Sequence, residues 1–144
     1  MSVLAVRSAT VGDVAATFAL AQARPYTAKW PAAALAAEVS RPDSLFVVAA
    51  DDHVRGYALA RIVERDCRLL DLAAESDGCG CGRALLSALA LAAKARGCVK
   101  VSFEASVGNE RALAFYAKAG AKVVGRRPKF YYDGSDAVLM DLDL

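Results

Sequence analysis

The sequence predicts one domain with an α/β fold, a mixed α+β arrangement in which helices flank a sheet of parallel and antiparallel strands. The first observation is that apolar strand-like runs alternate with alanine-rich stretches at helical spacing, in the order β-α-α-β-β-β-α-β-α-β-β. The second is a globular composition, 56% hydrophobic and 24% charged. The third is that no repeat, linker or low-complexity tract divides residues 1–144. We therefore expect a single domain over the whole chain.

The first three elements follow from strand alternation and helix-start signals. Residues 3–7 alternate in polarity like a first strand. Thr10 is a suitable N-cap for a helix over residues 10–23. Pro31 suits the first turn of a second helix, over residues 31–40. The chain therefore begins β-α-α.

Three strands come next. Residues 44–50 form a short apolar run with strong strand character. The polar turn 51–53 connects this run to a second strand over residues 54–65, so the two predict a hairpin. Residues 67–74 read as a further strand. An antiparallel portion of the sheet is expected here.

The second half of the chain alternates strands and helices. A glycine-rich segment leads into a long helix over 83–96, and a strand over 99–104 precedes a helix over 109–119. A glycine follows each of these helices, as is common at helix C-termini. Two strands, 122–131 and 137–142, complete the pattern.

The glycine-rich segment Gly78-Cys79-Gly80-Cys81-Gly82 indicates a phosphate site. A strand, a glycine loop and a helix in succession present free backbone N–H groups at the helix N-terminus, and glycine lets a pyrophosphate approach them. By itself the pattern is weak, because it also occurs in plain turns. A dinucleotide site would require G-x-G-x-x-G near the start of a βαβ unit and an acid about 20 residues on. The segment lies in mid-chain without that spacing, which argues against a nicotinamide cofactor.

Charge and apolar patterning limit the partners and the compartment. A formal charge of +2 gives no argument for nucleic acid or an anionic membrane. Residues 11–23 superficially resemble a signal peptide, but Asp13 interrupts them and their apolar residues recur at helical spacing. No apolar run approaches the roughly 18 residues that a membrane span needs. We expect a cytoplasmic protein.

The cysteines predict neither a disulfide nor a metal site. A reducing cytosol argues against disulfides among the four cysteines. Cys79 and Cys81 form a C-x-C pattern that could suggest zinc, but a zinc site requires four ligands and His53 is the only histidine. We expect no metal, and we interpret both cysteines as small residues of the glycine loop.

The order and motifs resemble those of GNAT-superfamily acetyltransferases. The resemblance to their acetyl-CoA-binding core rests on segments 71–74, 78–86 and 114–120, and on Glu104 and Asn109. The C-terminal segment 125–140 also resembles the bacterial ribosomal-protein-alanine N-acetyltransferases, the RimI type. The general resemblance covers the whole chain, and the RimI resemblance rests mainly on the residues from Glu104 onward.

The resemblance implies a GNAT fold with a central splayed pair of parallel strands and acetyl-CoA as cosubstrate. The splayed strand would form hydrogen bonds with the pantetheine arm of acetyl-CoA, and the glycine loop would bind its pyrophosphate. A residue at the start of the next helix would make a further contact with acetyl-CoA. These cofactor-binding positions are Leu72 and Ala74, then Gly78, Cys79, Gly80, Cys81, Gly82 and Arg83, and finally Asn109.

The resemblance further assigns Glu104 as general base and Tyr116 as the general acid that protonates the departing CoA thiolate. Strand alternation places Glu104 at the carboxyl end of its strand, where open α/β sheets bind ligands. A solvated strand-end carboxylate and a packed helix tyrosine are the structural alternatives. Tyr131 and Tyr132 are candidate substrate-binding residues. As neighbours in a strand they would face opposite sides, so only one would line the groove, and core and surface tyrosines are the alternative.

Two departures from the family pattern concern the glycine loop. The motif Q/R-x-x-G-x-G/A begins here with Asp77, whose carboxylate would oppose a pyrophosphate unless it points away. The loop between Ala74 and Gly80 is also shorter than usual.

The resemblance leaves three functions open. The first is acetyl transfer to a protein or peptide N-terminus, the second is transfer to a small-molecule amine, and the third is non-catalytic binding of CoA. The protein is expected to be a monomer or a homodimer.

Overall fold

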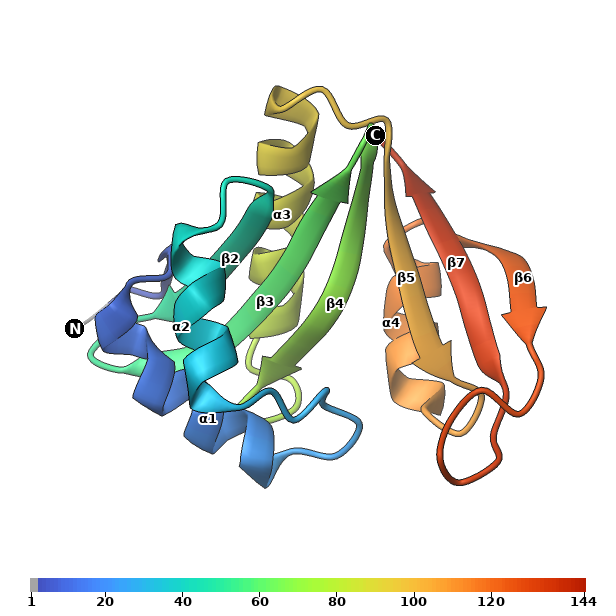
Figure 1. Cartoon of the computed structure of the whole chain (residues 1–144), viewed down its shortest axis with the longest axis horizontal. Helices are drawn as coiled ribbons and strands as arrows, with labels where there is room; N and C mark the ends of the chain where they lie inside the picture. Colours follow the sequence, from blue (N-terminus) through green and yellow to red (C-terminus); the bar gives the residue numbers. More distant parts are fainter. Residues whose placement is uncertain (1–2) are drawn as a thin grey trace.

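The computed structural model describes residues 3–144 and confirms the predicted mixed sheet. Seven strands lie in the order β1-β2-β3-β4-β5-β7-β6 (Figure 1). Within this sheet β4 and β5 pair in parallel, and the other neighbours pair antiparallel. The strands are β1 Ala5–Ser8, β2 Ser44–Ala50, β3 Val54–Val63, β4 Asp66–Ala74, β5 Lys100–Ser106, β6 Lys122–Arg127 and β7 Ala137–Asp143.

The helices cover both faces of the sheet. Helices α1 and α2 pack on one face of the β2–β4 region, and α3 packs on the other (Figure 1). Helix α4 lies on the same face as α3, where side chains of both helices join one apolar cluster. The helices are α1 Val14–Ala23, which follows the 3-10 turn η1 Val11–Asp13, α2 Ala32–Ser40, α3 Cys81–Ala95 and α4 Glu110–Lys118.

Thr10, the predicted N-cap, caps the 3-10 turn η1 that leads into α1. The Asp13 carboxylate accepts a hydrogen bond from the Thr10 backbone N–H at 2.8 Å and forms an ion pair with Arg7 at 2.7 Å. Hydrogen bonding from Arg7 lowers the pKa of Asp13 to about 2. A cap of this kind contributes about 1 kcal/mol to helix stability.

Strand alternation distributes the core between the two faces. Val48 and Tyr57 face α1 and α2 and pack with Leu35. Val47 faces the other side and packs with Leu85 of α3. Successive strand residues point to opposite faces, so the apolar run in β2 is buried on both sides.

Helix α3 packs close to the sheet because Gly56 has no side chain. A Cβ at this position would lie 3.0 Å from the Ala73 carbonyl oxygen and 3.1 Å from Cδ1 of Leu85. Glycine in β3 therefore sets the depth at which α3 lies, and with it the position of the turn that precedes α3.

Two predicted boundaries are wrong in ways that matter for the site. Helix α3 begins at Cys81 rather than at residue 83, because Gly80 adopts a left-handed conformation (φ 83°) as the N-cap. Strand β6 ends at Arg127 rather than at residue 131, because Pro128 has no N–H to donate and Lys129 has a φ of 51°. None of the helices in the described chain is long and apolar enough to cross a membrane.

Candidate active site

The central feature of the site is the divergence of β4 and β5. The two strands pair only at Asp66–Lys100, Cys67–Val101 and Arg68–Ser102. Beyond these pairs they separate (Figure 1), and a cavity of about 530 Å³ lies between them. This matches the expected splayed parallel pair. Six predicted site residues line this cavity: Leu72, Glu104, Asn109, Tyr116, Tyr131 and Tyr132.

Glu104 lies on the more open side of β5. Val101 and Phe103 are buried on one face of the strand, and alternation turns Glu104 to the other face. Its side chain is 38% exposed, and Oε1 lies 3.5 Å from Nη2 of Arg127. A carboxylate in this position can accept a proton from a group in the cavity and pass it to solvent.

Tyr116 comes from the opposite side, on α4. Its ring stacks on Phe103 with centroids 4.3 Å apart, and the residue is only 8% exposed. Burial raises the pKa of the Tyr116 hydroxyl, and the charge of Asp71 adds to this. The hydroxyl therefore stays protonated through the neutral pH range and can donate a proton. Stacking fixes the ring, so its hydroxyl keeps one position in the cavity.

Asp71 is a cavity residue for which the sequence predicted no role. The Tyr57 hydroxyl donates to Asp71 Oδ2 at 2.5 Å, and the Ala28 backbone N–H donates to the same oxygen at 3.3 Å. Burial raises the pKa of the Asp71 carboxyl, while the hydrogen bond from Tyr57 acts in the opposite direction. Its position in an apolar strand, directly before the predicted cofactor-binding residue Leu72, was the available signal.

Tyr131 and Tyr132 lie in the loop between β6 and β7, not in a strand. Both line the cavity, so the expectation that only one would do so is wrong. Strand alternation does not apply in a turn, which is closed by a bond from the Gly134 N–H to the Tyr131 carbonyl at 2.9 Å. Contact between the Ser106 and Ser135 hydroxyls, at 2.8 Å, ties this loop to β5.

Asn109 caps α4 at the edge of the cavity. Its Oδ1 accepts a hydrogen bond from the Ala112 N–H at 3.3 Å. The cap leaves the side-chain NH₂ of Asn109 available to a ligand. Asn109 is therefore at a helix start as expected, and its contact with acetyl-CoA stays a prediction.

The glycine turn follows directly from β4 but lies outside the cavity lining, as does Ala74. Gly78 and Gly80 have φ values of 77° and 83°, and a Cβ on either would meet nothing within 4 Å. The turn therefore exposes backbone that an incoming phosphate can approach. The first N–H groups of α3, at Cys81, Gly82 and Arg83, have no acceptor in their own helix.

Cys81 differs from its expected role as a loop residue. It lies in the first turn of α3, is 1% exposed and packs with Leu85. Burial raises the pKa of the Cys81 thiol to about 12. Its side chain therefore anchors the helix start, and only its backbone is available to a ligand.

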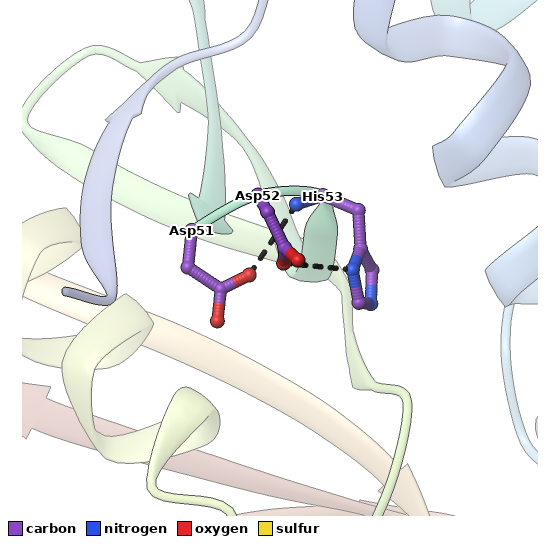
Figure 2. A group of neighbouring side chains, drawn as sticks. All are labelled: Asp51, Asp52 and His53. Carbon is purple, nitrogen blue, oxygen red and sulfur yellow. Dashed lines mark hydrogen bonds and ion pairs between the residues drawn. The ribbon is translucent and has the colours of Figure 1, made fainter. Parts of the chain in front are cut away.

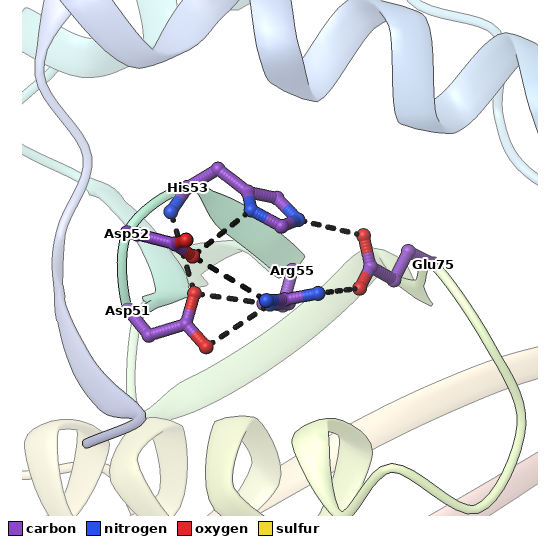
Figure 3. A network of polar contacts seen from close by, with 5 residues as sticks. All are labelled: Asp51, Asp52, His53, Arg55 and Glu75. Carbon is purple, nitrogen blue, oxygen red and sulfur yellow. Dashed lines mark hydrogen bonds and ion pairs between the residues drawn. The ribbon is translucent and has the colours of Figure 1, made fainter. Parts of the chain in front are cut away.

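A cluster of potential metal ligands lies elsewhere, in the β2–β3 turn. Asp51, Asp52 and His53 bring their ligand atoms within 4.8 Å of one another (Figure 2). Arg55 occupies the centre of this group, bonded to Asp51 at 3.0 Å and to Glu75 at 2.6 Å (Figure 3). Nδ1 of His53 lies 3.1 Å from Oδ1 of Asp52, and Nε2 lies 3.1 Å from Oε2 of Glu75. The Arg55 guanidinium thus already pairs with three carboxylates, those of Asp51, Asp52 and Glu75. We interpret the cluster as a charged network that holds the hairpin.

Comparison with known proteins agrees with this geometry. Residues 15–121 match the acetyltransferase (GNAT) family. An uncharacterised N-acetyltransferase of Methanocaldococcus jannaschii is 32% identical over 102 residues, which cover 69% of this chain and 65% of that protein. The chain thus spans just under two thirds of that relative.

Two solved structures share the fold. The ribosomal-protein-S18-alanine N-acetyltransferase of Escherichia coli has a TM-score of 0.85 at 23% identity, with 98% of this chain and 94% of that chain covered. The PaiA N-acetyltransferase of Thermoplasma acidophilum, solved in complex with coenzyme A, has a TM-score of 0.84 at 22% identity, with 99% of each chain covered. With the family match over most of its length, the chain belongs to the acetyltransferase (GNAT) family.

Proposed function

We propose that this protein transfers an acetyl group from acetyl-CoA to an amine, and that the acceptor is a protein or peptide N-terminus. The observation that carries the proposal is that Glu104 and Tyr116 line one cavity, at the opening of β4 and β5. One is an exposed carboxylate and the other a buried, protonated hydroxyl. Amine acetylation requires such a proton acceptor and proton donor.

Acetyl-CoA supplies the acetyl group as an activated thioester. The backbone at Leu72 and Ala74 is assigned to the pantetheine arm, because β4 has no strand partner at these positions on the β5 side. The N–H groups of the Gly78–Arg83 turn are assigned to the pyrophosphate. Asn109 is assigned to a further contact through its side-chain amide. The open space above Gly78 and Gly80 supports this fit.

Glu104 removes the proton of the acceptor ammonium, directly or through a water molecule. A peptide α-amine has a pKa near 8, compared with about 10.4 for a lysine side chain, so modest base assistance is sufficient for a peptide N-terminus. The Tyr116 hydroxyl donates a proton to the departing thiolate. Solvent exposure of Glu104 then allows the carboxylate to be regenerated.

The loop that carries Tyr131 and Tyr132 is assigned to the acceptor. Both side chains line the cavity beside Glu104. Burial, with a further contribution from the Glu104 charge, raises the pKa of the Tyr131 hydroxyl. Tyrosine offers a ring face and a hydrogen-bonding hydroxyl to a peptide backbone. We further propose that residues 1–144 act as one domain, because the seven strands of the described residues join one sheet. We also propose a cytoplasmic location, on the charge and apolar patterning of the sequence.

The experiment is an acceptor panel with acetyl-CoA, followed by mass spectrometry of the products. Short peptides with small first residues are expected to react faster than free amino acids and polyamines. The matched control is each peptide with a blocked N-terminus, which should not react. Exclusive turnover of a small amine would reject the peptide acceptor. Binding of CoA without turnover of any acceptor would favour a non-catalytic module.

A further inference from the structure

Asp77 joins two arginines from opposite sides of the sheet. Nη2 of Arg24 lies 2.6 Å from Asp77 Oδ1, and Nη1 of Arg111 lies 2.6 Å from Asp77 Oδ2. Arg24 directly follows α1, and Arg111 lies in the first turn of α4. The two guanidiniums therefore meet at the turn that connects β4 to α3, beside Gly78.

The cluster carries a net positive charge. Two arginines and one aspartate sum to +1, so the carboxylate does not make this end of the cleft repulsive to an anion. The sequence predicted that the Asp77 charge would oppose a pyrophosphate unless it points away. In the structure two arginines pair with that charge. The position where the family motif has Gln or Arg is acidic here, but guanidiniums reach it from two other elements.

These ion pairs can exchange partners. The side chains of Asp77 and Arg111 are 44% and 72% exposed. Exposed ion pairs contribute little to stability and are screened by salt. A phosphate offers a guanidinium more charge and more acceptor oxygens than a carboxylate, in a geometry that suits its planar fork.

We infer that Arg24 and Arg111 form a binding site for a phosphate group of CoA, and that Asp77 holds both guanidiniums in position beside the glycine turn. This inference rests on the proposed use of acetyl-CoA. It assigns the positive charge of the phosphate site to Arg24, which follows α1, and to Arg111 of α4, rather than to the β4–α3 turn itself. Both residues are phosphate ligands in this assignment, and Asp77 is a positioning residue.

The test is calorimetric titration of acetyl-CoA into wild type, Arg24→Gln and Arg111→Gln. Each variant is expected to bind about tenfold more weakly, as for the loss of one charge-assisted hydrogen bond. The dependence of log Kd on log salt concentration should become shallower in each. The matched control is Arg41→Gln, which breaks a similarly exposed pair with Asp43 and should leave both quantities unchanged.

A second ligand separates a phosphate contact from a change in cleft shape. S-Acetylpantetheine has no phosphate, and its weak binding can be followed by chemical-shift titration. Its affinity should be the same in wild type and both variants. Equal weakening of both ligands, or unchanged affinity for acetyl-CoA, would overturn the inference. Failure of the wild-type protein to bind acetyl-CoA would overturn the proposed function, and the inference with it.

Discussion

Three ionisable side chains, Glu104, Tyr116 and Asp71, share the cavity between β4 and β5 in different surroundings. Glu104 is partly exposed, whereas Tyr116 and Asp71 are each 8% exposed. Burial raises the pKa of both the Tyr116 hydroxyl and the Asp71 carboxyl, so each holds its proton more strongly than in water. At this scale, burial determines which groups retain a proton and which can exchange it.

Asp71→Asn tests the effect of burying this carboxyl. The native carboxyl binds its proton more tightly than the unfolded one, whose pKa is about 3.9. From about pH 4 up to the raised native pKa, the native state holds more protons, so its stability falls as pH rises. Asparagine keeps an acceptor for the Tyr57 hydroxyl but does not ionise. Urea unfolding from pH 4 to pH 7.5 measures the free energy of unfolding. The part of its decline that Asp71 causes should be absent in the variant.

Asp43→Asn is the control for this titration. Hydrogen bonding from Arg41 lowers the pKa of the Asp43 carboxyl, so its contribution is lost as pH falls rather than as pH rises. The decline above pH 4 should therefore persist in this variant. Identical pH dependence in wild type and Asp71→Asn would show that Asp71 titrates as it does in the unfolded chain.

At the scale of elements, the start of α3 determines where the proposed phosphate site can lie. Gly80 takes a left-handed conformation that ends the turn, and buried Cys81 fixes the first helical residue. A Cβ at Gly82 would lie 3.4 Å from the Phe115 ring of α4. The glycines therefore serve different purposes: Gly80 shapes the turn, and Gly82 allows α3 to approach α4.

Gly80→Ala should separate the binding role of the turn from its effect on folding. A non-glycine residue in the left-handed region costs about 1–2 kcal/mol. Gly97, at the other end of α3, has a φ of 85° and the same open surroundings. Gly97→Ala should therefore lower the free energy of unfolding by a similar amount. Only Gly80→Ala should also weaken acetyl-CoA binding, by tenfold or more in calorimetric titration. Equal acetyl-CoA affinities in the two variants would show that the phosphates do not bind at this turn.

Most elements were predictable because their signals are local. The apolar run of β2 gave bounds that the structure reproduces. The helix predicted from residue 109 agrees with α4, which Asn109 caps. Strand β6 is shorter than predicted: the aromatic residues Tyr131 and Tyr132 favour a strand, but Pro128 cannot donate to the ladder and ends it at Arg127. The sequence therefore identified Tyr131 and Tyr132 as candidate site residues, but it did not predict that they lie in a loop.

At the scale of the whole molecule, the site forms where the two parts of the sheet separate. Three parallel residue pairs join β4 to β5, and the cavity opens beyond them. The sequence predicted this opening through its family resemblance, together with Glu104 and Tyr116. It could not predict the bridge from Arg24 through Asp77 to Arg111, because residues so far apart in the chain meet only after α1, α3 and α4 have packed. The buried hydrogen bond between Tyr57 and Asp71 also joins residues distant in the chain, which the register of β3 and β4 brings together.

The most direct measurement of the proposed chemistry is kcat against pH, with a saturating acceptor, for wild type, Glu104→Gln and Tyr116→Phe. Loss of the base should lower kcat of Glu104→Gln by roughly 10²-fold at neutral pH. Higher pH should restore part of that rate, because more acceptor then arrives as neutral amine. Tyr116→Phe keeps the stacked ring but has no proton to donate, so its lower kcat should not recover at high pH. Wild-type rates in both variants, or equal recovery in both, would contradict the assignment of Glu104 as base and Tyr116 as acid.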